Sequence, residues 1–191
     1  MSDFIRQKIG YHGPIVASQS QNLPASVAVL ADEVDTVGVH GYWGNGRSPP
    51  PGDHTRWVAN VPQAGVPSGG VFAAMGGYRV RGLPLIASET NTAHPSMYGA
   101  EHAIELAAAM RGQDWDGAYL YALSVAFREE QQDIPKDGLD PLMVVQPQQD
   151  IGDSTRMTAL RAASRLALDP RVQPLPMKPN EPGEVSQLDL N

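Results

Sequence analysis

Four short apolar segments, each followed by a segment of helical character, constrain the fold of this chain more than any other feature. A strand followed by a helix, repeated along a chain, produces a parallel sheet with helices packed on it. The apolar segments are residues 14–17, 34–40, 83–87 and 118–123. The helical segments after them are residues 25–31, 71–78, 97–111 and 154–168. The sequence therefore predicts an α/β fold built from four βα units.

The third apolar segment, residues 83–87, stops at a carboxylate. Ser88 and Glu89 follow it directly, and Asn91 and His94 come shortly after. Enzymes of the α/β class place catalytic side chains at the carboxyl ends of their strands. We therefore expect Glu89 to stand at the edge of the sheet where chemistry takes place, with a solvated loop acid as the alternative.

Aromatic and imidazole side chains follow the second apolar segment. His40, Tyr42 and Trp43 are groups that could hydrogen-bond to a sugar ring or stack on it. Two structural roles are equally good interpretations: His40 could make its hydrogen bonds within the strand, and Trp43 could fix the following loop. The long Pro- and Gly-rich connection of residues 44–70 adds Trp57, a candidate for the wall of a binding site or a cover for the rim. Tyr121 either lines the floor of a pocket or belongs to the core.

The composition excludes several classes of function. The net charge is -7 and lysines and arginines form no cluster, so we expect no nucleic-acid partner. No apolar run approaches the ~20 residues of a membrane span, and residues 1–10 contain no recognisable signal peptide. The chain has no cysteine, no HxH or HExxH pair and no phosphate-binding loop, so we expect neither a metal nor a cofactor.

Taken together and in order, these residues resemble the second half of glycoside hydrolases of clan A, and most closely the cellulase-like and the agarase- or β-galactosidase-like members. The segments that carry the resemblance are residues 39–43, 82–91, 98–101 and 113–117. The resemblance implies a TIM-barrel type fold in which residues 1–169 form the C-terminal four βα units, strands five to eight of a (β/α)8 barrel. It implies that the Pro-rich residues 170–191 are a linker or the start of a β-sandwich domain.

The resemblance also implies an activity, the retaining hydrolysis of a β-linked oligo- or polysaccharide. Glu89 matches the nucleophile at the end of barrel strand seven, and residues 40–43 match the aromatic end of strand six. Trp115 and Asp116 precede the last strand and would lie at the barrel floor, away from the chemistry. The substrate-binding residues expected around the nucleophile are His40, Tyr42, Trp43, Trp57, Asn91, His94 and Tyr121.

One part of the clan's pattern is missing. The general acid/base of the clan is a Glu at the end of strand four, usually in an Asn-Glu pair, and the only such pair here is Asn180-Glu181 in the C-terminal tail. We therefore expect the isolated chain to be inactive and to self-associate through its unpaired outer strands. The implied partners are a carbohydrate substrate and the N-terminal barrel half, and the implied location is secreted or periplasmic.

Two other functions are compatible with the same residues. A non-catalytic carbohydrate-binding or structural half-barrel would use the aromatic side chains and not need Glu89. An unrelated open α/β hydrolase or binding protein would share only the βα pattern. An upstream segment with an Asn-Glu pair at the end of a strand would favour the glycosidase over the non-catalytic half-barrel.

Overall fold

The chain folds around a parallel sheet with helices on one side. The computed structural model describes residues 1–19, 27, 31–44, 60–92, 96–121 and 154–176. Within these residues, four strands form one sheet in the order β1-β2-β3-β4, and each neighbouring pair is parallel. The strands are β1 (Val16–Gln19), β2 (Thr36–Trp43), β3 (Leu85–Thr92) and β4 (Gly117–Leu120). The predicted α/β class with a parallel sheet is confirmed.

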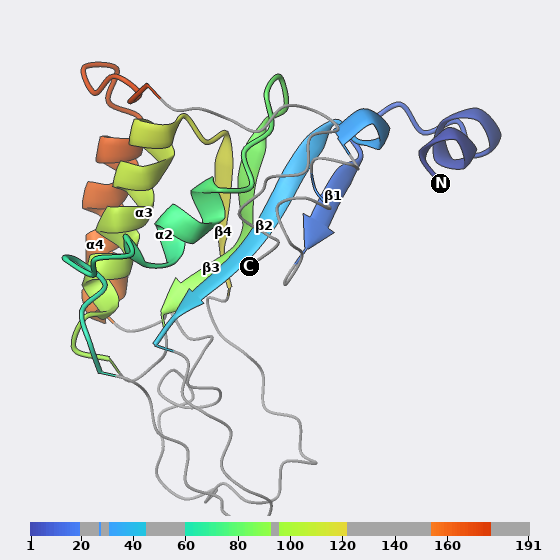
Figure 1. The fold of residues 1–191 in the computed structure, drawn as a ribbon. Coiled ribbons are helices and arrows are strands. Elements are labelled where there is room, and N and C mark those ends of the chain that lie inside the picture. The colour runs from blue at the N-terminus through green and yellow to red at the C-terminus, as the bar shows by residue number, and fades with distance from the viewer. Residues whose placement is uncertain (20–26, 28–30, 45–59, 93–95, 122–153, 177–191) are drawn as a thin grey trace, which may run out of the picture.

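The helices connect and cover the strands. Helix α2 (Gly70–Gly76) lies between β2 and β3, α3 (Gly99–Gln113) lies between β3 and β4, and α4 (Ser154–Ala167) follows β4. Figure 1 shows these three helices on the same side of the sheet. Strands that follow one another in chain order, with the helices on one side, make a singly wound sheet. A doubly wound sheet instead reverses its strand order and carries helices on both faces.

A short helical turn precedes each of the first two strands. A π-helical turn, η1 (Phe4–Lys8), lies ahead of β1, and a 3-10 turn, η2 (Ala31–Glu33), leads into β2. Of the helix predicted over residues 25–31, most lies outside the described residues. The described helices contain none that is long and apolar enough to cross a membrane.

The main core fills the space between the sheet and the helices. Apolar side chains of β2 and β3 pack there against those of α2 and α3. Trp115 belongs to the same cluster and contacts Phe72. The buried members are Val27, Ala31, Val37, Val39, Phe72, Met75, Val80, Leu85, Ala87, Leu106 and Trp115. A second, smaller cluster of Ala103, Ala107 and Ala163 joins α3 to α4, where the short side chains allow the two helices to approach closely.

The central strands are longer than the sequence pattern predicts. We expected them to end at His40 and Ala87, but β2 continues to Trp43 and β3 to Thr92. His40 pairs with Glu89, and the pairing runs on to the ends of both strands. The hydroxyls of Thr90 and Thr92 donate to backbone carbonyls of β2, so these polar residues are buried without losing their hydrogen bonds. Apolar content alone therefore underestimates the strand length.

The start of α3 also differs from the prediction. The sequence pattern predicts a helical segment from residue 97, but the helix begins at Gly99 and Tyr98 occupies the cap position without a side-chain cap bond. The Ser96 hydroxyl accepts a hydrogen bond from the Tyr98 amide at 3.1 Å. Its role is to order the turn that enters the helix.

Asp116 makes two hydrogen bonds with Leu85 at the start of β3, at the opposite end of this strand from Glu89. The Asp116 carboxylate accepts a hydrogen bond from the Leu85 amide at 3.0 Å, and the Asp116 amide donates to the Leu85 carbonyl at 2.8 Å. Trp115 beside it is 6% exposed and packs in the core. Both residues lie where β3 begins, which agrees with their exclusion from the candidate site.

Gly41 allows α2 to press against β2. A Cβ atom at Gly41 would lie 2.5 Å from Met75 Sδ and 2.6 Å from Val71 Cγ2. Real Cβ atoms do not approach other atoms so closely, so the Met75 and Val71 side chains, or the helix that carries them, would have to move. The contact also fixes directions, because it shows that position 41 faces the helices while His40 and Tyr42 face away.

We predict that Gly41→Ala destabilises the fold by about 1–3 kcal/mol, the usual cost of overpacking a core. The matched control is Gly112→Ala in α3, where the new Cβ meets only Leu175 Cδ1 at 3.9 Å. That substitution should stabilise the protein by about 0.5–1 kcal/mol, because Gly is the poorer helix former. Urea denaturation of both variants measures the difference, and equal effects would contradict the packing argument.

Candidate functional site

The candidate site is built on the sheet face that points away from the helices. Glu89 reaches this face because β3 carries an extra residue there. Ala87 pairs with Val39 and Glu89 pairs with the very next residue, His40, so Ser88 is the extra residue of a β-bulge. Leu85 and Ala87 are core residues, and strict alternation would have directed Glu89 into the core as well. The bulge turns Glu89 outward and Thr90 inward.

Tyr42 and His40 hold the Glu89 carboxylate. The Tyr42 hydroxyl donates a hydrogen bond to Glu89 Oε2 at 2.6 Å, and His40 Nδ1 lies 3.4 Å from the same oxygen. A short O–H···O bond to a carboxylate is among the stronger hydrogen bonds in proteins. The Glu89 side chain keeps 35% exposure, against 16% for His40, so a ligand has access to the carboxylate.

The surroundings keep Tyr42 protonated. Burial raises the pKa of the Tyr42 phenol, and the hydrogen bond to Glu89 and the negative charge of that carboxylate raise it further. Tyr42 therefore stays a hydrogen-bond donor to Glu89 across the physiological pH range.

Two tyrosines of the β4 region extend the same face. Ala118 and Leu120 pack against the core, so Tyr119 and Tyr121 project from the opposite face. Tyr119 is 64% exposed and Tyr121 is 38% exposed. The sequence analysis named Tyr121 and missed Tyr119. The alternation of apolar and aromatic residues along residues 118–121 is the signal that would have found it.

Trp43 is tied to the loop that begins at residue 60. Its indole Nε1 donates to the Val61 carbonyl at 3.0 Å, and its own carbonyl accepts from Thr92 Oγ1 at 3.2 Å. The same loop is held on α3, because Glu101 accepts from the Gln63 amide at 2.9 Å. Gln63 Nε2 donates to Glu105 Oε2 at 2.6 Å, and burial raises the pKa of Glu105.

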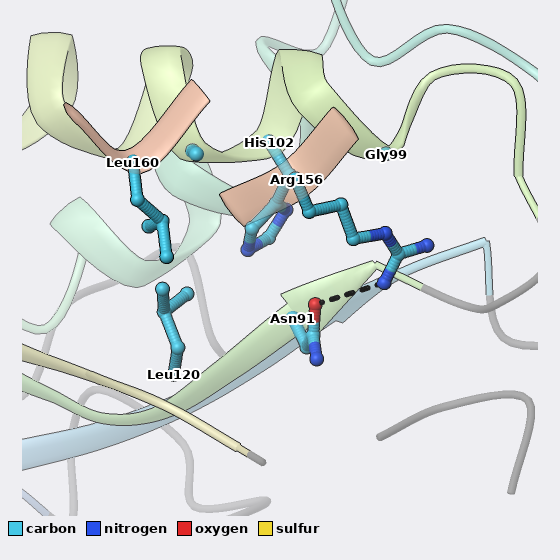
Figure 2. Close-up of a pocket in the computed structure, with 7 residues that line it drawn as sticks. Asn91, Gly99, His102, Leu120, Arg156 and Leu160 are labelled. Carbon is cyan, nitrogen blue, oxygen red and sulfur yellow. Dashed lines mark hydrogen bonds between the residues drawn. The ribbon is translucent and has the colours of Figure 1, made fainter. Parts of the chain in front are cut away.

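Asn91 is buried near the end of β3 and makes its hydrogen bonds within the protein. It is 2% exposed, and its amide Nδ2 donates to the Tyr121 carbonyl at 2.9 Å. Its Oδ1 accepts from the Thr92 amide at 2.8 Å and from Arg156 Nη1 at 3.4 Å. Figure 2 shows Arg156 reaching from α4 toward Asn91, with His102 beside it. These contacts make Asn91 a link between β3, the end of β4 and α4.

The cavity around Asn91 and Arg156 is too small for a sugar. It measures about 10 Å³, room for about one water molecule, and it is lined by Asn91, Gly99, His102, Ala103, Leu120, Arg156 and Leu160. Gly99 makes way for the arginine, since a Cβ there would lie 2.4 Å from Arg156 Nε. The Glu89 side chain, which is 35% exposed, lies outside this cavity.

His102 is the most strongly perturbed titratable group beside the site. It is 4% exposed, its Nε2 lies 3.1 Å from Thr90 Oγ1, and Phe72 packs on its ring with the centroids 4.9 Å apart. Burial and, to a smaller extent, the positive charge of Arg156 together lower the pKa of His102 to about 3. His102 is therefore neutral at physiological pH.

Some expected site residues cannot be placed. Trp57 and His94 lie outside the described residues, as does His54. Within the part of the chain that the structure describes, no group of three or more His, Cys, Asp or Glu side chains is arranged to hold a metal ion. No protein-family model matches the sequence, and no curated protein matches it.

We predict that His102 makes the fold sensitive to acid. An unfolded His binds a proton near its ordinary pKa of 6.5, but His102 in the fold does so only near pH 3. Between these values the unfolded chain holds more protons, so stability falls as the pH is lowered through this window. Glutamine does not titrate, so the free energy of unfolding of His102→Gln should differ less between about pH 7 and about pH 4.5 than that of the unmodified protein. Urea midpoints at both pH values measure this, and an unchanged difference would contradict it.

Proposed function

We propose that this chain is the C-terminal half of a (β/α)8-barrel retaining glycosidase, with Glu89 as its nucleophile. The observation that carries the proposal is the hydrogen bond of 2.6 Å from Tyr42 to Glu89 Oε2, with His40 Nδ1 3.4 Å from the same oxygen. A carboxylate held in one orientation on an open sheet face is suited to attack a substrate carbon. The family resemblance of the sequence points to the same residue.

The fold supports the barrel part of the proposal. A (β/α)8 barrel is a parallel sheet with its strands in chain order and its helices outside. The described strands follow the order β1-β2-β3-β4, and the described helices α2, α3 and α4 share one side of the sheet. In the proposed barrel these strands are numbers five to eight. Glu89, Tyr42 and His40 then face the interior, as catalytic side chains of such barrels do.

In the proposed reaction, Glu89 Oε1 attacks the anomeric carbon while Tyr42 holds Oε2. The glycosidic C–O bond breaks, a general acid protonates the leaving oxygen, and a glycosyl ester forms on Glu89. Water, deprotonated by the same acid/base, then attacks the anomeric carbon and releases the sugar and the Glu89 carboxylate. The second carboxyl group must stand about 5–5.5 Å from Glu89. We assign it to strand four of the N-terminal half, so this chain needs that half for activity.

We predict that an activated 2-deoxy-2-fluoroglycoside labels Glu89 in the protein that contains both halves. Fluoride or dinitrophenolate leaves without protonation, so the label reports on the nucleophile and not on the acid/base. Peptide mass spectrometry should find the sugar on Glu89 and none in Glu89→Gln. Tyr42→Phe should label more slowly, because the carboxylate is no longer held. A label on another carboxylate would refute the assignment.

A non-catalytic carbohydrate-binding role is the second candidate, and the exposed tyrosines favour it. Tyr119 and Tyr121 are 64% and 38% exposed on the face that carries Glu89. Tyrosine rings are suited to stack on sugars, because they are flat and apolar with one polar end.

In this second case, binding of β-linked oligosaccharides by the chain alone should survive Glu89→Gln and be lost in Tyr119→Ala or Tyr121→Ala. Isothermal titration calorimetry measures it, with Tyr11→Ala as a control for an exposed tyrosine elsewhere. Equal loss in all three tyrosine variants, or a requirement for Glu89, would contradict the binding role.

A further inference from the structure

We propose that Thr90 and His102 are positioning residues that hold the bulge in β3 and so keep Glu89 against Tyr42. Neither residue touches a substrate in this proposal. They act from the helix side of the sheet, through the backbone of the two central strands. The inference rests on the proposed role of Glu89 only for its catalytic consequence, because the geometric effect on the Tyr42–Glu89 hydrogen bond is measurable by itself.

The strand pairing beside Glu89 is irregular. Between Ala87 and Thr90, β3 carries one residue more than β2 on one side, and one residue more than β4 on the other. A bulge redirects side chains and interrupts the ladder of backbone hydrogen bonds. The direction of Glu89 is therefore not fixed by the regular ladder, and other contacts have to hold the bulged strand in place.

Thr90 supplies such a contact directly after Glu89. Its hydroxyl donates a hydrogen bond to the Gly41 carbonyl at 2.7 Å, and Gly41 stands between His40 and Tyr42 on β2. One side chain therefore joins the residue after the carboxylate to the residue between its two partners. Helix α2 packs closely against Gly41, because its Met75 and Val71 side chains leave no space for a Cβ there.

His102 completes a hydrogen-bond chain with a fixed direction. A carbonyl accepts only, so the single Thr90 hydroxyl proton points at Gly41, and His102 Nε2 at 3.1 Å must be the donor to Thr90 Oγ1. The proton on a neutral imidazole then sits on Nε2, and Nδ1 is bare. This agrees with the absence of a hydrogen-bond partner for His102 Nδ1 among the described residues. The chain runs from α3 through β3 to β2.

The experiment observes the Tyr42–Glu89 hydrogen bond without any sugar. In the 191-residue chain, tyrosine labelled with carbon-13 at Cζ gives an NMR signal that senses hydrogen bonding of the phenol. Tyr42→Phe assigns the Tyr42 signal, and Glu89→Ala shows where it lies when the bond is lost. Thr90→Val keeps the volume and removes the hydroxyl. We expect it to move the signal most of the way to the Glu89→Ala position, and Thr90→Ser to leave it in place.

The matched control is Thr92→Val. Thr92 is equally buried, and its hydroxyl donates to the Trp43 carbonyl at 3.2 Å, so it makes the same kind of bond between the same strands. A purely structural role would make the two valine variants alike, whereas positioning requires that only Thr90→Val moves the Tyr42 signal. An unmoved signal in Thr90→Val, or equal movement in Thr92→Val, overturns the proposal.

His102 variants keep the test decisive if Thr90→Val does not fold. His102→Gln retains a nitrogen donor near the place of Nε2 and should preserve the signal, while His102→Leu should move it. A signal that is unmoved in His102→Leu overturns the proposal. Labelling of Glu89 by the fluorinated glycoside gives the catalytic consequence, since Thr90→Val should slow it and Thr92→Val should not. If no variant and not even the unmodified protein is labelled, the glycosidase assignment fails while the NMR result stands.

Discussion

The pairing of β2 with β3 is the contact on which the rest of the structure depends. It brings Glu89 opposite His40 and next to Tyr42, although 47 residues separate Tyr42 from Glu89 along the chain. Two contacts stabilise this pairing. Helix α2 packs against Gly41, and the Thr90 hydroxyl donates a hydrogen bond to the Gly41 carbonyl. The same residues that continue the strands beyond their apolar parts therefore also assemble the candidate site.

The two sides of the sheet have separate tasks. The side that faces the helices carries the apolar core and the buried polar side chains Thr90 and His102, whose hydrogen bonds join the two central strands to each other and to α3. The other side carries the ionisable and aromatic groups: Glu89, Tyr42, His40, Tyr119 and Tyr121. Asn91 shows that closeness in the sequence does not decide the role of a residue. It is close to Glu89 in sequence, but its amide serves the joint between β3, Tyr121 and Arg156.

The bulge at Ser88 explains how a core strand delivers a carboxylate. Without the extra residue, Glu89 would continue the inward series of Leu85 and Ala87, and a buried carboxylate without a cationic partner is costly. With it, Glu89 turns to the open face and Thr90 takes the inward position, where a hydroxyl finds a carbonyl and an imidazole. One extra residue in β3 therefore directs Glu89, the proposed nucleophile, to the outer face and Thr90 to the helix side.

The sequence by itself determined the class of the fold and most of its elements, because apolar strand patterns and helical periodicity are local properties. It also singled out Glu89, His40 and Tyr42, since polar residues after an apolar segment are visible without a structure. Only the tertiary structure decided which of the neighbouring polar residues stand together. Strand ends, the bulge and the buried roles of Asn91 and His102 follow from pairing and packing between distant segments. Pairing depends on contacts with residues far away in the chain, and no local pattern records them.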